Sequence, residues 1–186
     1  LDGLSPHTDL VKIQEIIGIV PQEYALYPSL TARENLTFFG SLFGLKKNEL
    51  QARIDDALQR VGLAEFADRK VTHFSGGMKR RCNLLAGILH SPKVLFLDEP
   101  TVGVDVQSRK LTIDFLRELN KNGMTIIYTS HHMTEAEHFC TKIAIIDQGK
   151  IFTEGSPKDL ISQTANARNL EDVFLAQTGK ELRDAI

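Results

Sequence analysis

The chain is poor in the residues and patterns that mark several classes of protein. Its 186 residues include no tryptophan and two cysteines, Cys82 and Cys140. Two cysteines give no disulfide framework and suit a reducing compartment. The formal net charge of −2 lacks the basic excess of a nucleic-acid-binding protein, so we expect no nucleic-acid partner. No apolar run reaches the length of a membrane span and no signal segment opens the chain, so any membrane role requires a separate partner.

Two adjacent acids follow a short apolar run. Val94 to Leu97 is a continuous apolar segment, which predicts a buried strand, and Asp98 and Glu99 come directly after it before Pro100. An α/β protein binds its ligands at the carboxyl ends of such strands. Aspartate oxygens suit Mg²⁺, and a neighbouring glutamate can act on an attacking water. Taken alone, the pattern is equally compatible with an acidic turn.

A glycine-rich turn lies earlier in the chain and opens into a helix. Ser75 is a candidate helix cap, and Gly76 and Gly77 allow backbone N–H groups to approach an anion closely. The helix is expected to run to about His90. The basic run at residues 79–81 is most simply a solvent-exposed face.

Two further segments complete a series of motifs. Gln22 follows an expected strand at Ile16–Val20, and His131 follows an expected strand at Met124–Thr129. In this order and at these spacings the chain resembles the ATP-binding subunit of ABC transporters. Gln22 then matches the Q-loop, residues 74–78 the signature motif, and residues 94–98 Walker B. Glu99 matches the catalytic glutamate, residues 103–105 the D-loop, and His131 the H-loop.

The resemblance implies an α/β fold of the P-loop NTPase type, with a parallel-sheet core and an inserted helical subdomain. Residues 1–22 would be a core segment ending in the Q-loop, and residues 23–92 the helical subdomain with the signature motif. Residues 93–155 would form the RecA-like core, and residues 156–186 a helical tail, with a helix at 169–182. Within the subdomain, Thr31 to Glu34 is a capping-box pattern that predicts a helix to about Leu42.

One family motif has no match in this sequence. The phosphate-loop pattern G-x-x-x-x-G-K-[ST], which supplies a backbone cradle and a lysine for the nucleotide phosphates, does not occur. The chain therefore looks like a fragment without its N-terminal part. We expect the whole subunit to bind and hydrolyse ATP, the fragment alone to be inactive, and the fragment to expose an apolar sheet edge or helix face.

The resemblance also implies roles for single residues. Asp98 and Gln22 would hold Mg²⁺ with the ATP phosphates, Glu99 would act on the water, and His131 would contact the γ-phosphate. Residues 75–77 would contact ATP held by a second copy of the subunit in a head-to-tail dimer. Asp105 would lie at the junction of that dimer.

The segments at residues 27–36 and 169–175 resemble bacterial export-type subunits of the drug- and antibiotic-resistance group. Such a subunit would lie peripherally at the cytoplasmic face of the membrane and act with an integral membrane transporter subunit. The residues proposed to contact that subunit are Tyr24, Leu26, Tyr27 and Phe39. Two alternatives stay open: a soluble ABC ATPase acting on ribosomes or DNA, and a non-enzymatic dimerisation or regulatory module.

Overall fold

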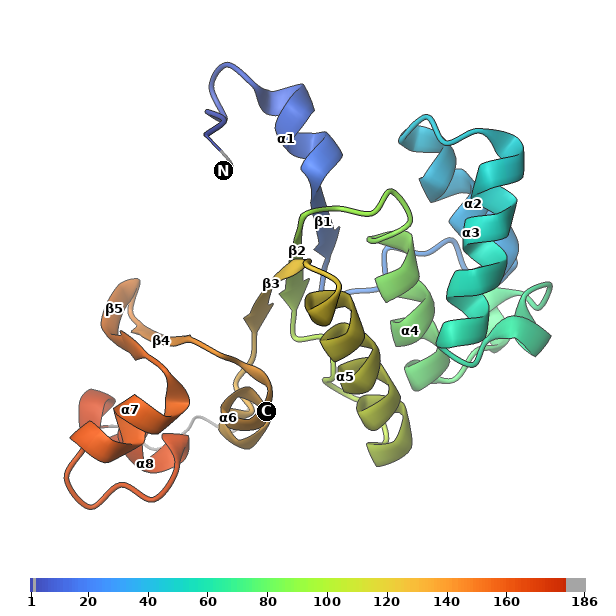
Figure 1. Cartoon of the computed structure of the whole chain (residues 1–186). Helices are drawn as coiled ribbons and strands as arrows, with labels where there is room; N and C mark the ends of the chain where they lie inside the picture. The colour runs from blue at the N-terminus through green and yellow to red at the C-terminus, as the bar shows by residue number, and fades with distance from the viewer. Residues whose placement is uncertain (2, 180–186) are drawn as a thin grey trace. The chain divides into compact units, whose positions relative to one another are not determined.

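The computed structural model describes residue 1 and residues 3–179 of the chain (Figure 1). The chain divides into two compact units, Leu1–Thr129 and Ser130–Ile186. Each unit has its own β-sheet and its own buried apolar residues.

A three-stranded parallel sheet forms the centre of the first unit. Its strands are β1 (Ile17–Val20), β2 (Val94–Asp98) and β3 (Thr125–Thr129), in the order β1-β2-β3. Parallel pairing brings the carboxyl ends of all three strands to one edge of the sheet. The expected parallel sheet is therefore confirmed, and so is the placement of the acids at the end of its central strand.

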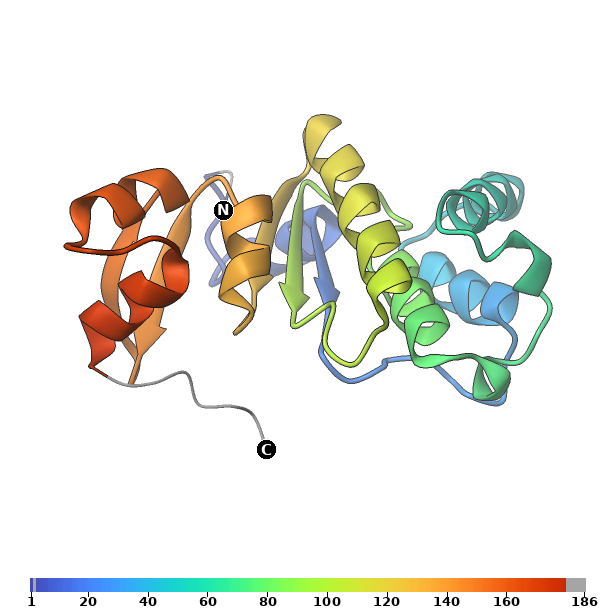
Figure 2. The same ribbon diagram turned by 90° about the horizontal axis from the view of Figure 1, so that it is seen from below.

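The two faces of this sheet differ. One face is covered by α4 (Gly76–Ala86) and α5 (Val106–Lys121), which lie on the same side of the strands (Figure 2). On the other face Ile19 and Ile127 lie in register across β2 and are 61% and 43% exposed. The exposed apolar surface is thus a face of the sheet, whereas a sheet edge or a helix face was predicted.

The remaining helices of this unit are α1 (Leu10–Ile16), α2 (Ala32–Leu42), α3 (Lys47–Arg60) and the short 3₁₀ turns η1 (Ala64–Phe66) and η2 (Val71–His73). The predicted capping box is confirmed, since the Thr31 hydroxyl accepts from the Glu34 N–H and the Glu34 carboxylate accepts from the Thr31 N–H. Helices α2 and α3 pack against each other and against α4, with Leu36, Ile54 and Leu58 buried.

The signature helix α4 ends earlier than its apolar pattern predicts. It stops at Ala86 instead of about His90, and Gly87 caps it. A Cβ atom on Gly87 would lie 2.6 Å from Val20 Cγ2, and one on Gly18 would overlap the Gly87 carbonyl oxygen. The two glycines therefore let the end of α4 lie directly against β1, because neither position has room for a side chain.

The second unit contains a two-stranded antiparallel ribbon and three helices among its described residues. These are α6 (Met133–Phe139), β4 (Ile143–Asp147), β5 (Lys150–Gly155), α7 (Pro157–Gln163) and α8 (Leu170–Thr178). Its core consists of Ile145, Leu160, Leu170 and Val173. Helix α8 is capped by Gly179 in the left-handed region, at φ +63°; residues 180–182 of the predicted tail helix lie outside the described residues.

Candidate active site at the carboxyl edge of the sheet

Asp98 is the last residue of the central strand and lies exposed at the carboxyl edge. The Thr129 hydroxyl, at the end of the neighbouring strand β3, donates to Asp98 Oδ1 over 2.6 Å. Because Asp98 and Thr129 are register partners, the pleat of the sheet fixes this contact. The hydrogen bond orients the carboxylate and leaves it accessible from the edge. Nothing in the sequence had indicated a role for Thr129.

Glu99 has an unusual backbone conformation for a side-chain-bearing residue. Its φ is +46°, in the left-handed region, and its N–H donates to the Thr129 carbonyl oxygen over 3.2 Å. Such a conformation costs free energy in a non-glycine residue, and residues of this kind cluster at functional sites. The turn directs the chain away from the sheet immediately after Asp98.

Gln22 follows β1 and Pro21 at the same edge, and its backbone is held by the signature helix. Arg80 donates to the Gln22 carbonyl oxygen over 2.7 Å, and Asn83 donates to the Pro21 carbonyl oxygen over 3.3 Å. The Asn83 side-chain oxygen also accepts from the Ala25 N–H over 3.0 Å. The Q-loop segment, residues 21–25, is thus attached to α4 by Arg80 and Asn83, which the sequence did not indicate as its partners.

The expectation that the basic run is solvent-exposed is wrong for two of its three residues. Arg80 is 3% exposed and Arg81 is also buried. The Arg80 guanidinium lies 5.0 Å from the Tyr24 ring, and the Tyr24 hydroxyl donates to the Gly76 carbonyl oxygen over 3.3 Å. Arg80 faces inward because the segment between β1 and α2 crosses α4, which no pattern local to the helix reveals.

Charge around this edge is mixed. Burial lowers the pKa of Arg80, and the nearby Tyr24, Asp98 and Glu99 partly oppose that effect. An arginine nevertheless remains protonated in proteins, so Arg80 places a positive charge near the two acids.

Burial also raises the pKa of the Cys82 thiol to about 12, which makes this cysteine unreactive at neutral pH.

The signature residues begin α4 as the sequence predicts. Ser75 is the N-cap, and its hydroxyl accepts from the Met78 N–H over 3.2 Å. Gly76 is exposed, whereas Gly77 is buried against the start of α5, where an added Cβ would lie 2.6 Å from Ser108 Cβ. The second glycine is therefore required by helix packing, independently of any ligand.

Asp105 begins α5. Its carboxylate accepts from the Ser108 N–H over 2.9 Å, and hydrogen bonds from Ser108 lower the pKa of Asp105. This is the geometry of a helix N-cap. In the first unit, Asp105 thus has a structural role whether or not it also meets a ligand.

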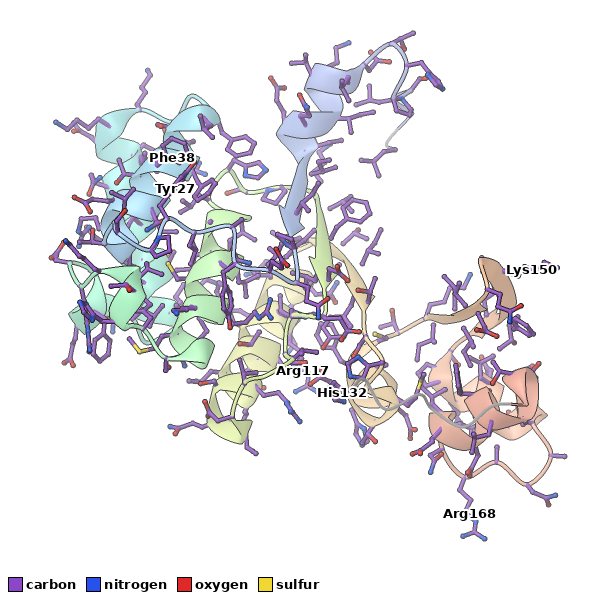
Figure 3. The ribbon with its side chains drawn as sticks, turned by 180° about the vertical axis from the view of Figure 1, so that it is seen from behind. Tyr27, Phe38, Arg117, His132, Lys150 and Arg168 are labelled. Carbon is purple, nitrogen blue, oxygen red and sulfur yellow. The ribbon has the colours of Figure 1, made fainter. Side chains whose placement is uncertain are left out.

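His131 belongs to the second unit. It precedes α6 and is exposed. Its ring centroid lies 4.2 Å from that of His132, the residue labelled in Figure 3. The His132 N–H donates to the Ser130 hydroxyl over 3.0 Å. These contacts define the local conformation of the segment that matches the H-loop.

The donor set at the edge fits Mg²⁺ bound together with a nucleotide. Mg²⁺ commonly takes one or two protein oxygens and completes its shell with waters and phosphates. Asp98 offers an exposed, oriented carboxylate, and Gln22 offers an exposed amide just beyond the adjacent strand. Within residues 1 and 3–179, no group of three or more His, Cys, Asp or Glu side chains could hold a metal ion by itself.

Comparisons with known proteins agree with the motifs. The family described as ABC transporter matches residues 2–102. The linearmycin resistance ATP-binding protein of Bacillus subtilis is 50% identical, over 88% of this chain and 57% of its own length. The Nod factor export ATP-binding protein I of Burkholderia thailandensis is 44% identical, over 78% of this chain and 48% of its own.

The chain thus spans about half the length of these curated relatives. A solved structure described as the ATP-binding subunit of an ABC transporter superimposes with a TM-score of 0.84, at 23% identity, over 96% of this chain and 75% of that one. At that identity the likeness establishes the fold alone.

Proposed function

The chain belongs to the ABC transporter family as an ATP-binding domain, and we propose that the full-length protein binds and hydrolyses ATP to drive an export-type membrane transporter. The observation that carries this proposal is the convergence of Gln22, Asp98 and Glu99 at the carboxyl edge of one parallel sheet. This is the edge at which α/β proteins bind nucleotides.

In this proposal each acid has one task. Asp98, oriented by the Thr129 hydroxyl, would hold Mg²⁺ together with Gln22. The metal, when bound, neutralises charge that develops on the phosphates. Glu99 accepts a proton from the attacking water and orients it. His131 contacts the γ-phosphate, a role that rests on its match to the H-loop.

The signature residues serve a second copy of the protein. Ser75, Gly76 and Gly77 stand at the N-terminus of α4, where backbone N–H groups and the helix dipole favour an anion. We assign this site to the γ-phosphate of ATP held by the partner copy in a head-to-tail dimer. Asp105, at the start of α5, lies at that junction and keeps its capping role there.

The export class and the membrane partner are supported by relatives and by one surface. Two of the relatives are named for linearmycin resistance and Nod factor export. Among the described residues, none of the helices combines the length and apolar character needed to span a bilayer. Of the four residues expected to contact that subunit, Tyr24 and Tyr27 are exposed and Phe39 is half-buried, but Leu26 is buried in the core, so its expected contact is wrong. Phe38, which is also exposed, has its ring centroid 5.1 Å from that of Tyr27 (Figure 3). We assign this aromatic surface to contact with an integral membrane subunit, at the cytoplasmic face of the membrane.

The test is ATP hydrolysis by the full-length protein. We expect turnover by the native protein, and binding of ATP without turnover by the Glu99→Gln variant. Glu65→Gln, the same exchange at an exposed helical turn, is the matched control and should retain full turnover. The 186 residues alone, which contain no phosphate-loop pattern, should show none. A native full-length protein that neither binds nor hydrolyses ATP would refute the proposal.

A further inference from the structure

The Q-loop segment, residues 21–25, is attached to the signature helix by two buried polar side chains. Arg80 donates to the Gln22 carbonyl oxygen at 2.7 Å and lies 3.4 Å from that of Pro21. Asn83, one turn further along the same face of α4, both donates to the segment and accepts from it. Helix and loop are thus joined at both ends of the segment.

Arg80 is an unusual choice for a purely structural contact. A buried guanidinium loses its hydration, and a well-packed apolar side chain often supports a fold equally well. Arg80 is 3% exposed, and its Nε has no hydrogen-bond partner among the described residues. Its charge-assisted bond goes to a backbone oxygen of the very residue that matches the Q-loop glutamine. This contact fixes where the backbone of Gln22 stands relative to Asp98.

A third contact closes a ring of interactions. The guanidinium lies over the Tyr24 ring, and Tyr24 in turn bonds the first turn of α4 through the Gly76 carbonyl oxygen. Tyr24 and Arg80 therefore link the N-terminus of the helix, where the signature residues lie, to the loop. Neither contact involves the catalytic acids directly.

We propose that Arg80 is a positioning residue that sets Gln22 at the carboxyl edge of the sheet and makes its placement depend on the signature helix. This inference rests on the proposed function, because Gln22 acts there through Mg²⁺ and ATP. It predicts that Gln22 contributes to activity only while Arg80 holds its backbone.

A double-mutant cycle tests the dependence. In the full-length protein, Gln22→Ala should raise the Mg²⁺ concentration needed for half-maximal ATP hydrolysis. In the Arg80→Met background, which preserves an unbranched side chain, Gln22→Ala should have little further effect. The matched control is Arg69→Met, because Arg69 also lies over an aromatic ring, Phe66, but is exposed and away from the loop. In that background Gln22→Ala should keep its whole effect. Equal effects of Gln22→Ala in all three backgrounds would overturn the inference.

Amide hydrogen exchange separates this inference from the proposed function. The Ala25 N–H is bonded to Asn83, so exchange in residues 22–25 reports the attachment of the loop without any ATP. Arg80→Met should accelerate exchange there by about tenfold or more, the effect of losing one hydrogen bond to a charged group, while Arg69→Met should not. A protein without ATPase activity that shows this acceleration refutes only the proposed function. Unchanged exchange refutes the positioning role.

Discussion

A substitution of Gly77 by alanine distinguishes a packing requirement from a ligand-binding requirement within the signature motif. An added Cβ at residue 77 would lie 2.6 Å from Ser108 Cβ and 3.2 Å from an Asp105 carboxylate oxygen. The Ser108 Cβ is fixed to the backbone of α5, so it cannot rotate away. At residue 76 the nearest atoms are the Gly103 carbonyl oxygen at 3.5 Å and the Tyr24 hydroxyl at 3.7 Å, which are ordinary contacts.

The magnitude comes from comparing the two variants. Each gains the helix propensity of alanine over glycine, at most about 1 kcal/mol. Only Gly77→Ala also meets the steric cost of overpacking, about 1–3 kcal/mol. The difference in unfolding free energy between Gly76→Ala and Gly77→Ala is therefore about 1–3 kcal/mol, with Gly77→Ala the less stable. For a domain of about 150–250 residues, the melting temperature would differ by about 2–4 °C per kcal/mol.

The assay is urea and thermal unfolding of the full-length protein without nucleotide, so that ligand binding cannot contribute. Ser108→Gly is the companion change, because it removes the obstructing Cβ from the opposite helix. Ser108→Gly should lower the free energy of unfolding clearly less in the Gly77→Ala background than in the native background. The two substitutions would then have a favourable coupling energy of about 0.5 kcal/mol or more. Equal stability of the two alanine variants, or zero coupling to residue 108, would show that α4 and α5 do not approach as described.

Three further predictions concern the site and its surroundings. Glu99→Gln should lower the ATP turnover number by about 10²-fold or more while ATP binding, measured by calorimetry, persists; unchanged turnover would exclude Glu99 as the base. Thr129→Val removes the 2.6 Å hydrogen bond to Asp98 and should raise the Mg²⁺ concentration for half-maximal turnover several-fold, with the melting temperature as a control for folding. Burial lowers the pKa of His90, whose ring nitrogen Nε2 lies 2.8 Å from the Ile17 carbonyl oxygen. Neutral His90 therefore contributes its full stabilisation to the folded protein above the unfolded-state pKa of about 6.5. That stabilisation is lost as the pH falls below this value toward the lower folded-state pKa, because the unfolded chain then binds the proton more readily. Urea unfolding at pH 8 and pH 5.5 should show a smaller loss of stability on acidification for His90→Gln than for the native protein.

Local signals in the sequence predicted the elements that local contacts stabilise. The capping box at Thr31 and Glu34 lies within one turn of α2, and the Ser75 cap lies within one turn of α4. The apolar run ending at Asp98 needed only its own composition to be recognised as a buried strand. In each case the interaction that fixes the element joins residues close in sequence, so a single segment contains the signal.

The features that the sequence did not predict depend on contacts between residues that are distant in sequence. The end of α4 lies against Gly18 of β1, a residue distant in sequence, so the pattern of the helix alone did not show where it ends. The same holds for Thr129, which becomes a partner of Asp98 only once β3 pairs with β2. A threonine at the end of a strand carries no local sign of that role.

The signature helix therefore has more constraints than its motif alone suggests. Gly77 on one side must be small because the N-terminus of α5 packs there, and Arg80 and Asn83 on another side donate hydrogen bonds to the carbonyl oxygens of Gln22 and Pro21. Neither contact involves nucleotide. The same helix contacts both the N-terminus of α5 and the Q-loop segment, so the proposed dependence of Gln22 on the signature residues would pass through α4. Packing and hydrogen bonding within the first unit are the basis on which we propose this coupling, and hydrogen exchange at residues 22–25 measures it most directly.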